Sequence, residues 1–394
     1  MRAVTWQGPR NVQVEEVPDP VITEPTDAIV RITATAICGS DLHLYEPLAP
    51  FMTPGDVIGH EPMGVVEALG NEVTNLQVGD RVVIPFNISC GHCWMCDRQL
   101  YSQCETTQVR EFGAGAALFG FSEMYGQVPG GQAELLRVPH ADFGPIKVPD
   151  ELPDDRVLFL SDILPTAWQG VKYADVGPGD SLAVIGLGPV GQFAVRSARA
   201  MGVENIIAVD LEPERLAMAA RHGATPVDVN ATDGVGDALR ELTGGRGPDG
   251  VLDAVGMEAH GSPVAGFAQK AASILPDAVA KPMTENVGVD RLAALYSAID
   301  GVRRGGVISL SGVYGGAASP IPMLSLFDKQ ITLRMGQCNV KQWIDELMPL
   351  VTDDADPLGT EDLVTHRGTL EDAPQLYETF QKKDDGCIKI VLNP

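Results

Sequence analysis

The chain has 394 residues, 44% of them hydrophobic and 21% charged, a composition typical of globular proteins and long enough for two domains. Its 53 acidic and 28 basic residues give a net charge of −25, which argues against nucleic acid as a partner, because such binding rests on neutralising phosphates with Lys and Arg. The acidic excess is compatible with a high-salt host or with ordinary solubility. No apolar run reaches the ~18 residues of a membrane span, and no signal peptide is evident, so we expect a cytoplasmic protein without membrane contact.

The N-terminal part of the chain predicts a lobe rich in antiparallel strands. Residues 12–15 and 28–32 alternate apolar and polar side chains, the period of a half-buried strand. Residues 63–70 and 78–84 predict further strands joined by glycine-containing turns. Residues 112–131 show no clear period and predict a long loop, either a lid or a subunit contact.

A group of potential metal ligands and proton carriers follows the second of these strands. Cys38, Ser40, Asp41 and His43 lie within six residues, and His60 comes about twenty residues later. Cys38 and His60 offer a soft sulfur and an imidazole, a plausible pair of zinc ligands. The alternative is a buried free cysteine and an unrelated histidine.

Four cysteines, Cys90, Cys93, Cys96 and Cys104, lie within fifteen residues. Four thiolates complete the tetrahedral shell of zinc and leave no position for substrate, so we predict a structural zinc in a small lobe. Two disulfides or four free thiols are the alternatives, and disulfides need an oxidising compartment. The common bacterial iron–sulfur run has a different last gap and a following proline, whereas Glu105 follows here.

One acidic residue interrupts an otherwise apolar helical stretch. Residues 154–174 predict helix, broken around 160–166, and Asp162 lies within the break. A buried carboxylate needs a partner, since an unpaired buried charge is costly. Asp162 is therefore either a third zinc ligand or a helix cap.

A glycine-rich turn between a strand and a helix predicts a dinucleotide site. The strand 181–185 leads into Gly186-Leu187-Gly188-Pro189-Val190-Gly191 and then into a helix over 192–201. The glycines permit a tight turn, close approach of pyrophosphate and close helix packing. The helix N-terminus adds free N–H groups and a positive dipole end.

The next strand, 205–209, ends at Asp210, nineteen residues after the last glycine. A carboxylate there accepts hydrogen bonds from ribose hydroxyls and repels a 2′-phosphate, which favours NAD over NADP. The alternative is a simple turn residue. Arg215 either stacks on the adenine or is a solvated helix residue.

Further α/β units follow this pair of strands. We predict a helix over 214–221, strands over 250–256 and 305–312, and an insertion within 257–298. A helix beginning at Leu370 and a last strand over 387–392 follow, and that strand can return to the first lobe.

Taken in order, these motifs resemble those of the zinc-dependent medium-chain alcohol dehydrogenases, over essentially the whole chain. Residues 130–134 and 159–166 resemble the glutathione-independent formaldehyde dehydrogenases and dismutases in particular. The resemblance implies an α/β fold with a GroES-like β-rich catalytic domain over 1–163, a Rossmann domain with a doubly wound parallel sheet over 164–312, and a return to the catalytic domain over 313–394.

The resemblance also implies two zinc ions per chain, NAD and a set of site residues. Cys38, His60 and Asp162 would hold the catalytic zinc, with Phe86 in the substrate pocket. Ser40 and His43 would form the proton relay. Asp41 would orient His60, and Glu61 would approach the metal. The cofactor would be bound by Gly186, Gly188, Pro189, Val190, Gly191, Asp210, Arg215, Thr166 near the nicotinamide, Val255, and Lys389 at the pyrophosphate.

The implied activity is hydride transfer between NAD and a small alcohol, or an aldehyde hydrate, bound at zinc. The resemblance implies formaldehyde as the substrate class. Phe86, Trp94 and, if it faces inward, Trp168 suggest a small or apolar ligand rather than a sugar. The alternatives are a dismutase that retains its cofactor, a polyol or threonine dehydrogenase, and a non-catalytic NAD-binding protein. The family resemblance further implies a homo-oligomer, with a tetramer favoured.

Overall fold

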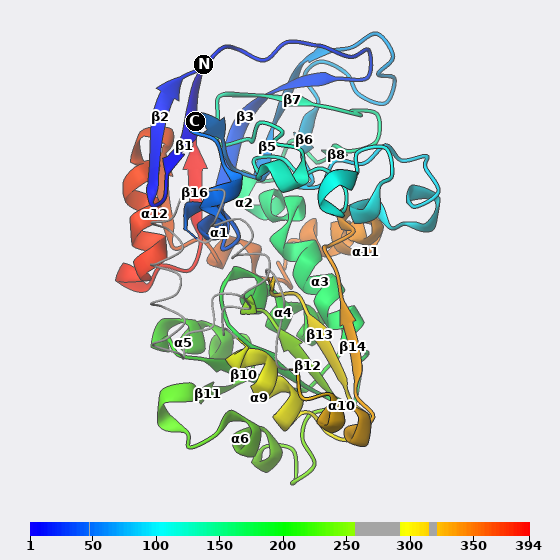
Figure 1. Ribbon diagram of the computed structural model, residues 1–394, viewed down its shortest axis with the longest axis vertical. Coiled ribbons are helices and arrows are strands. Elements are labelled where there is room, and N and C mark those ends of the chain that lie inside the picture. Colours follow the sequence, from blue (N-terminus) through cyan, green and yellow to red (C-terminus); the bar gives the residue numbers. More distant parts are fainter. Residues whose placement is uncertain (47, 257–291, 315–320) are drawn as a thin grey trace. The chain divides into compact units, whose positions relative to one another are not determined.

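The computed structural model describes residues 1–46, 48–256, 292–314 and 321–394 (Figure 1). The chain forms two compact units: the first comprises Met1–Pro165 and Cys338–Pro394, and the second Thr166–Gln337. The domain limits given above, 163/164 and 312/313, remain predictions. Within the described ranges, no helix is both long and apolar enough to span a bilayer.

The first unit is built on antiparallel β-structure, as the alternating sequence pattern indicates. Its main sheet has the order β15-β16-β3-β5-β6-β8, with β7 also pairing with β3, and a smaller sheet has the order β2-β1-β4. The strands are β1 (Arg2–Gly8), β2 (Asn11–Glu16), β3 (Ala28–Ile37), β4 (Asp56–Val57), β5 (Glu61–Leu69), β6 (Arg81–Val83), β7 (Leu135–Val138), β8 (Ile146–Lys147), β15 (His366–Thr369) and β16 (Ile390–Asn393).

The last strand of the chain pairs with one of the first. Ile390 lies opposite Ile37 and Val391 opposite Ala36 in the antiparallel pair β16–β3, and the red and blue strands lie side by side in Figure 1. This confirms the predicted return of the C-terminal strand. The first unit is therefore made of two separate stretches of the chain.

Short helices fill the connections of the first unit. The α-helices are α1 (Asp41–Tyr45), α2 (Asp154–Val157), α11 (Val340–Val351) and α12 (Ala373–Lys382). The 3-10 helices are η1 (Ala49–Phe51), η2 (Cys96–Arg98), η3 (Tyr101–Gln103), η4 (Arg110–Phe112), η5 (Glu123–Tyr125), η6 (Leu158–Ser161), η9 (Thr360–Asp362), η10 (Leu370–Asp372) and η11 (Asp384–Gly386). Helix α3 (Ile163–Tyr173) runs from the first unit into the second.

The second unit is a parallel six-stranded sheet of order β11-β10-β9-β12-β13-β14. Its strands are β9 (Ser181–Ile185), β10 (Asn205–Asp210), β11 (Thr225–Asp228), β12 (Gly250–Asp253), β13 (Val307–Leu310) and β14 (Thr332–Met335). Its helices are α4 (Pro189–Ala200), α5 (Pro213–Arg221), η7 (Val229–Ala231), α6 (Val235–Glu241), α9 (Ala293–Gly301) and α10 (Met323–Lys329). The strand order reverses between β9 and β12, the position at which such sheets bind ligands.

Helices cover both faces of this sheet, which explains why its inner strands, such as β9 and β10, are mostly apolar and buried. On one face, Leu239 of α6 and Leu295 of α9 pack in one buried cluster with Ala183 and Ile207 of the sheet. On the other face, a Cβ added at Gly191 of α4 would lie 3.6 Å from Val184 Cγ1. Of the insertion predicted over 257–298, residues 257–291 lie outside the described part of the chain.

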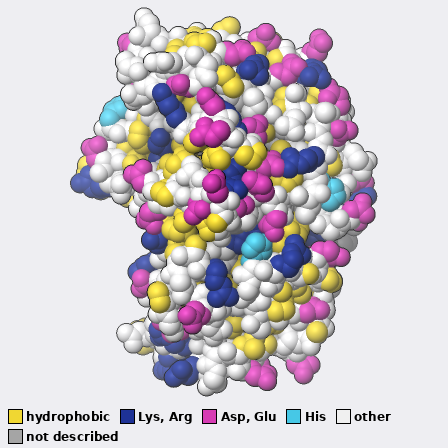
Figure 2. All heavy atoms as spheres, turned by 180° about the vertical axis from the view of Figure 1, so that it is seen from behind, with side chains coloured by type: hydrophobic (Ala, Val, Ile, Leu, Met, Phe, Trp, Pro, Cys, Tyr) yellow, Lys and Arg dark blue, Asp and Glu magenta, His cyan; other side chains and the backbone are white. Residues whose placement is uncertain are grey.

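Acidic and basic side chains are interspersed over the face shown in Figure 2.

Candidate metal centre and cofactor site

Antiparallel pairing brings the first two candidate ligands together. Cys38 directly follows β3, and His60 directly precedes β5. The register places Ala36 opposite Glu61, so the end of β3 adjoins the beginning of β5. Two residues that are 22 positions apart therefore reach one point, because neighbouring antiparallel strands run in opposite directions.

Asp162 joins this pair from the break between η6 and α3. Its Oδ2 lies 3.3 Å from His60 Nε2 and 3.7 Å from Cys38 Sγ. Together with Glu61, these residues form a buried cluster whose potential ligand atoms all lie within 4.8 Å of one another. The structure therefore brings together the three predicted ligands of the catalytic zinc.

The chemistry of the donor set fits a divalent cation. One thiol, one imidazole and two carboxylates are buried together, and unpaired charges are costly there. Burial raises the pKa of Cys38 to about 11, and the charges of Glu61 and Asp162 act in the same direction. A bound zinc ion would supply the missing positive charge and deprotonate the thiol.

Asp41 sets the orientation of the His60 ring. Its Oδ1 lies 2.9 Å from His60 Nδ1, and its Oδ2 accepts a hydrogen bond of 2.9 Å from the Cys38 N–H. With Nδ1 directed at this carboxylate, Nε2 points into the cluster. Burial lowers the pKa of His60, but the Asp41 charge and the hydrogen bonds to Asp162 and Asp41 outweigh it, so the net shift is upward.

The two predicted relay residues, Ser40 and His43, lie close to this centre in sequence. Ser40 Oγ is 3.1 Å from His60 Nε2. His43 is 6% exposed and lies on α1, the short helix that begins at Asp41.

The role of Lys389 at the cofactor pyrophosphate stays a prediction, and the structure places its side chain beside Glu61. Its ammonium is fully buried and donates hydrogen bonds of 2.6 Å to Glu61 Oε1 and 3.0 Å to the Ile37 carbonyl. The sequence shows a lysine near the end of the chain, but it does not show that the Glu61 carboxylate is buried next to this lysine. In the structure the ammonium group of Lys389 forms an ion pair with the Glu61 carboxylate, because an unpaired buried charge is costly.

Aromatic rings flank the His60 side chain. The ring of Phe86, the predicted pocket residue, is centred 6.3 Å from that of His60, and Phe121 lies at the same distance. Phe121 was missed because its segment showed no period. Trp94 was expected to indicate a small substrate, but it is 55% exposed and stacks under Arg98, with the guanidinium carbon 3.6 Å from the ring centre.

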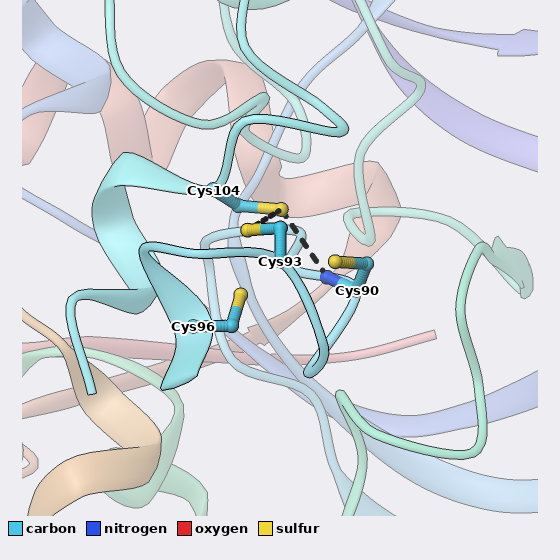
Figure 3. A group of neighbouring side chains, drawn as sticks. All are labelled: Cys90, Cys93, Cys96 and Cys104. Atoms are coloured by element: carbon cyan, nitrogen blue, oxygen red, sulfur yellow. Dashed lines mark hydrogen bonds between the residues drawn. The ribbon is translucent and has the colours of Figure 1, made fainter. Parts of the chain in front are cut away.

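The four cysteines of the lobe point toward one another (Figure 3). Their sulfurs form a second group within 4.8 Å, and all are free thiols; Cys93 Sγ and Cys104 Sγ are 3.9 Å apart, far beyond the ~2.05 Å of a disulfide. Backbone N–H groups donate to these sulfurs, for example Cys90 N to Cys104 Sγ at 3.3 Å. Burial raises the pKa of Cys93, but hydrogen bonds from Cys96 and Glu105 N–H groups lower it to about 6 overall. The lobe fits a tetrahedral zinc ion.

The glycine-rich turn of the second unit has the space that a dinucleotide needs. Gly186 has φ +87°, and a Cβ on Gly191 would lie 1.9 Å from the Gly186 carbonyl oxygen, so both positions require glycine. Gly188 instead faces open space apart from Arg215 Nη1 at 3.8 Å. Pro189 and Val190 begin α4, and its N-cap is Gly188, which has no side chain that could cap the first N–H groups of the helix. This end fits a phosphate group.

Asp210 anchors the turn at the end of β10. Its Oδ2 accepts a hydrogen bond of 2.6 Å from the Leu187 N–H, and its Oδ1 accepts from the Leu211 and Glu212 N–H groups at 2.7 and 2.9 Å. Arg215 Nη1 lies 4.0 Å from the same carboxylate. Thr166 lies on α3, and Val255 follows β12, where its N–H donates to Asp253 Oδ1 at 2.9 Å.

Comparisons with known proteins agree with this geometry. The family model "Alcohol dehydrogenase GroES-like domain" matches residues 24–150, and "Zinc-binding dehydrogenase" matches residues 189–274. The chain is 42% identical to the zinc-type alcohol dehydrogenase-like protein AdhB of Bacillus subtilis, with all of both chains covered. It is 34% identical to a glutathione-independent formaldehyde dehydrogenase of Pseudomonas aeruginosa, covering all of this chain and 97% of the relative.

Among solved structures, alcohol dehydrogenase TADH from Thermus sp. ATN1 matches with a TM-score of 0.82 and 38% identity, covering 100% of this chain and 99% of that one. The fold is thus the medium-chain dehydrogenase fold, with a GroES-like domain and a Rossmann sheet. The chain belongs to the zinc-containing alcohol dehydrogenase family, and it is an oxidoreductase of that type.

Proposed function

We propose that this oxidoreductase interconverts a small alcohol, or the hydrate of a small aldehyde such as formaldehyde, with its oxidised product, using NAD and two zinc ions per chain. The observation that carries the proposal is the buried cluster of Cys38, His60, Glu61 and Asp162. Its donors are those of an open catalytic zinc site, while the four-cysteine lobe offers a closed one. The similarity to a formaldehyde dehydrogenase supports the substrate class.

Each residue of the centre has a distinct part in this chemistry. Cys38, His60 and Asp162 would hold zinc, which as a Lewis acid lowers the pKa of an alcohol hydroxyl, while NAD accepts the hydride. Asp41 keeps His60 Nε2 directed at the metal position. We assign proton removal from the substrate to Ser40 and onward transfer to His43. Glu61 stays paired with Lys389 beside the centre.

The aromatic rings support a small substrate. The rings of Phe86 and Phe121 are each centred 6.3 Å from the His60 ring in edge-to-face geometry, and they offer no hydrogen-bond donors to a chain of hydroxyl groups. A polyol dehydrogenase would need polar groups there, because a site rejects or accepts hydroxyls chiefly by pairing them. Because the rings near His60 are apolar, we place a polyol or threonine dehydrogenase second to an enzyme for small alcohols or aldehydes.

We further propose NAD rather than NADP as the cofactor. Asp210 presents a carboxylate at the end of β10, where it would repel a 2′-phosphate. Arg215 is held 4.0 Å from this carboxylate and is therefore partly neutralised by it.

A homo-oligomer is also part of the proposal. Strand β14 is an edge of the parallel sheet, and all four of its residues are exposed. Met335 on this strand and Leu324 and Phe327 on α10 are 60%, 73% and 83% exposed. An exposed apolar edge strand is a template for another strand, and a second copy of the chain can pair with it about a two-fold axis. Light scattering distinguishes a monomer from a dimer or tetramer.

The test of the activity is incubation of the purified protein with isotope-labelled formaldehyde and NAD, without glutathione, followed by NMR. Formate with an equal amount of NADH is the expected result. Formate and methanol in equal amounts would indicate a dismutase that retains its cofactor. If neither product forms, the formaldehyde assignment is wrong, and turnover of polyols would favour the second candidate.

A further inference from the structure

Gln132 lies in the loop before β7, and no role in the site has been assigned to it above. Its side chain is fully buried and packs against Gly59, the residue before His60. A Cβ on Gly59, which has φ +96°, would lie 2.3 Å from Gln132 Cγ. The backbone of the loop bonds to the same segment, since Gln132 N–H donates to the Ile58 carbonyl at 3.1 Å. The Gln132 amide is thus held against the stretch that carries His60.

Three polar groups surround the Gln132 amide. Tyr377 Oη lies 2.9 Å from Oε1, the Ala36 carbonyl oxygen 3.3 Å from Nε2, and Asp41 Oδ2 3.5 Å from Nε2. A peptide carbonyl and an ionised carboxylate only accept hydrogen bonds. The amide NH₂ must therefore face Ala36 and Asp41, which leaves the amide oxygen for the phenol.

Tyr377 is the outer end of this chain of donors. It lies on α12 and is fully buried. Burial raises the pKa of Tyr377 well above its usual value, and the charge of Asp41 acts in the same direction. The phenol therefore stays protonated and donates its hydrogen to Gln132.

The chain of hydrogen bonds ends at the metal centre. Asp41 Oδ2 receives the Cys38 N–H at 2.9 Å and adjoins the Gln132 amide, while Oδ1 faces His60 Nδ1 at 2.9 Å. Both carboxylate oxygens are thus engaged, and the plane of the carboxylate is set from two sides. With that plane set, a neutral His60 ring would carry its proton on Nδ1 and leave the lone pair of Nε2 for a metal.

We propose that Gln132 and Tyr377 are positioning residues of the metal centre, which hold Asp41 so that His60 presents Nε2 to the ion. This inference rests on the proposed catalytic zinc. Outer partners of ligand histidines commonly change metal affinity by about 10–100-fold. Because these two residues act one step further out, we expect the lower end of that range.

The experiment measures metal binding rather than turnover. Tyr377→Phe removes only the phenol oxygen, and Gln132→Met replaces the amide with an apolar side chain of similar length. For each variant, zinc content is determined, zinc affinity is measured by competition with a chromophoric chelator, and the visible spectrum is recorded after cobalt replaces the zinc of this centre. Tyr45→Phe is the matched control, because Tyr45 lies in the same core cluster, 5.6 Å from the Tyr377 ring, whereas the amide of Gln132 bonds to Tyr377, Ala36 and Asp41.

We expect roughly tenfold weaker binding of the more labile zinc in both variants, a shifted cobalt band, and a wild-type spectrum for Tyr45→Phe. The double variant should match Gln132→Met alone, because Tyr377 acts through Gln132. Wild-type affinity and spectrum in Tyr377→Phe would overturn the inference while leaving the proposed function intact. A wild-type protein that holds zinc only in the cysteine lobe would overturn both.

Discussion

The Lys389 ammonium lies 2.6 Å from Glu61 Oε1, and neither side chain is exposed to solvent. Glu61 begins β5 and Lys389 directly precedes β16, and both strands pair with β3 between them. The pair therefore ties the C-terminal strand to the strand that follows His60. Burial alone lowers the pKa of Lys389, but the charge of Glu61 outweighs burial and raises it.

Replacing Lys389 by methionine should destabilise the protein strongly. The substitution leaves the Glu61 carboxylate buried without its cation, which costs about 3–5 kcal/mol in free energy of unfolding. Urea denaturation measures this loss. The double variant Lys389→Met, Glu61→Gln should recover most of it, since no charge then remains buried. A double variant as unstable as Lys389→Met would show that packing, not charge, is responsible.

Replacing Cys96 by alanine should remove one zinc ion per chain. Three thiolates no longer close the shell, and the lobe has a core of only a few apolar residues around Cys90, Cys96 and Cys104. Elemental analysis should give about one zinc instead of two, and proteolysis should cut within the lobe. Cys387→Ala, at a buried cysteine outside the lobe, should retain both ions. Two zinc ions in Cys96→Ala would contradict the assignment.

Asp27 should make the stability of the first unit depend on pH. Its Oδ2 accepts hydrogen bonds from Thr23 and Glu24 N–H groups, from Thr23 Oγ1 and from Arg137 Nη1, at 2.9–3.0 Å. Burial raises the pKa of Asp27, but these bonds outweigh it and the net shift is downward. The stabilisation is therefore complete above the unfolded-state pKa, near ~4, and is lost as pH falls through the lower folded-state value.

The variant Asp27→Asn tests this pH dependence. It should cost about 1–3 kcal/mol at neutral pH, and its difference from the wild type should shrink below pH ~4. Denaturation at a series of pH values measures the difference. Asp19→Asn, at an exposed carboxylate that pairs with the N-terminus, should cost less than about 1 kcal/mol. A difference for Asp27→Asn that does not vary with pH would refute the role of its charge.

Asp210→Asn should change the choice of cofactor. It removes the charge that would repel a 2′-phosphate and weakens the bond to the Leu187 N–H, a charge-assisted bond of about 1.5–3 kcal/mol. We expect NADH to bind about tenfold more weakly and NADPH to bind more tightly, as measured by fluorescence titration. Glu214→Gln, on the helix that follows, is the control and should change neither affinity. An unchanged ratio of the two affinities would exclude Asp210 as the selector.

Local patterns in the sequence were sufficient for several features. The four-cysteine lobe and the glycine-rich turn could be predicted because their members are close in sequence and their spacing alone restricts the chemistry. The strands around residues 12–15 and 28–32 could be predicted because a half-buried strand imposes alternation. Cys38 and His60 were also expected as a pair of ligands, because a soft sulfur and an imidazole both suit zinc.

Other features depended on side chains that meet only after folding. Lys389 is visible in the sequence as a basic residue, but its burial against Glu61 depends on the pairing of strand β16, near the end of the chain, with strand β3, near its beginning. The chain from Tyr377 through Gln132 to Asp41 joins residues up to 336 positions apart, and no periodicity connects them. The sequence by itself thus determined the kinds of ligand, because these follow from local spacing, and it indicated the class of fold through the resemblance of its motifs to a known family. The tertiary structure alone decided which buried polar groups pair, because that depends on which strands become neighbours and on the need of every buried charge for a partner.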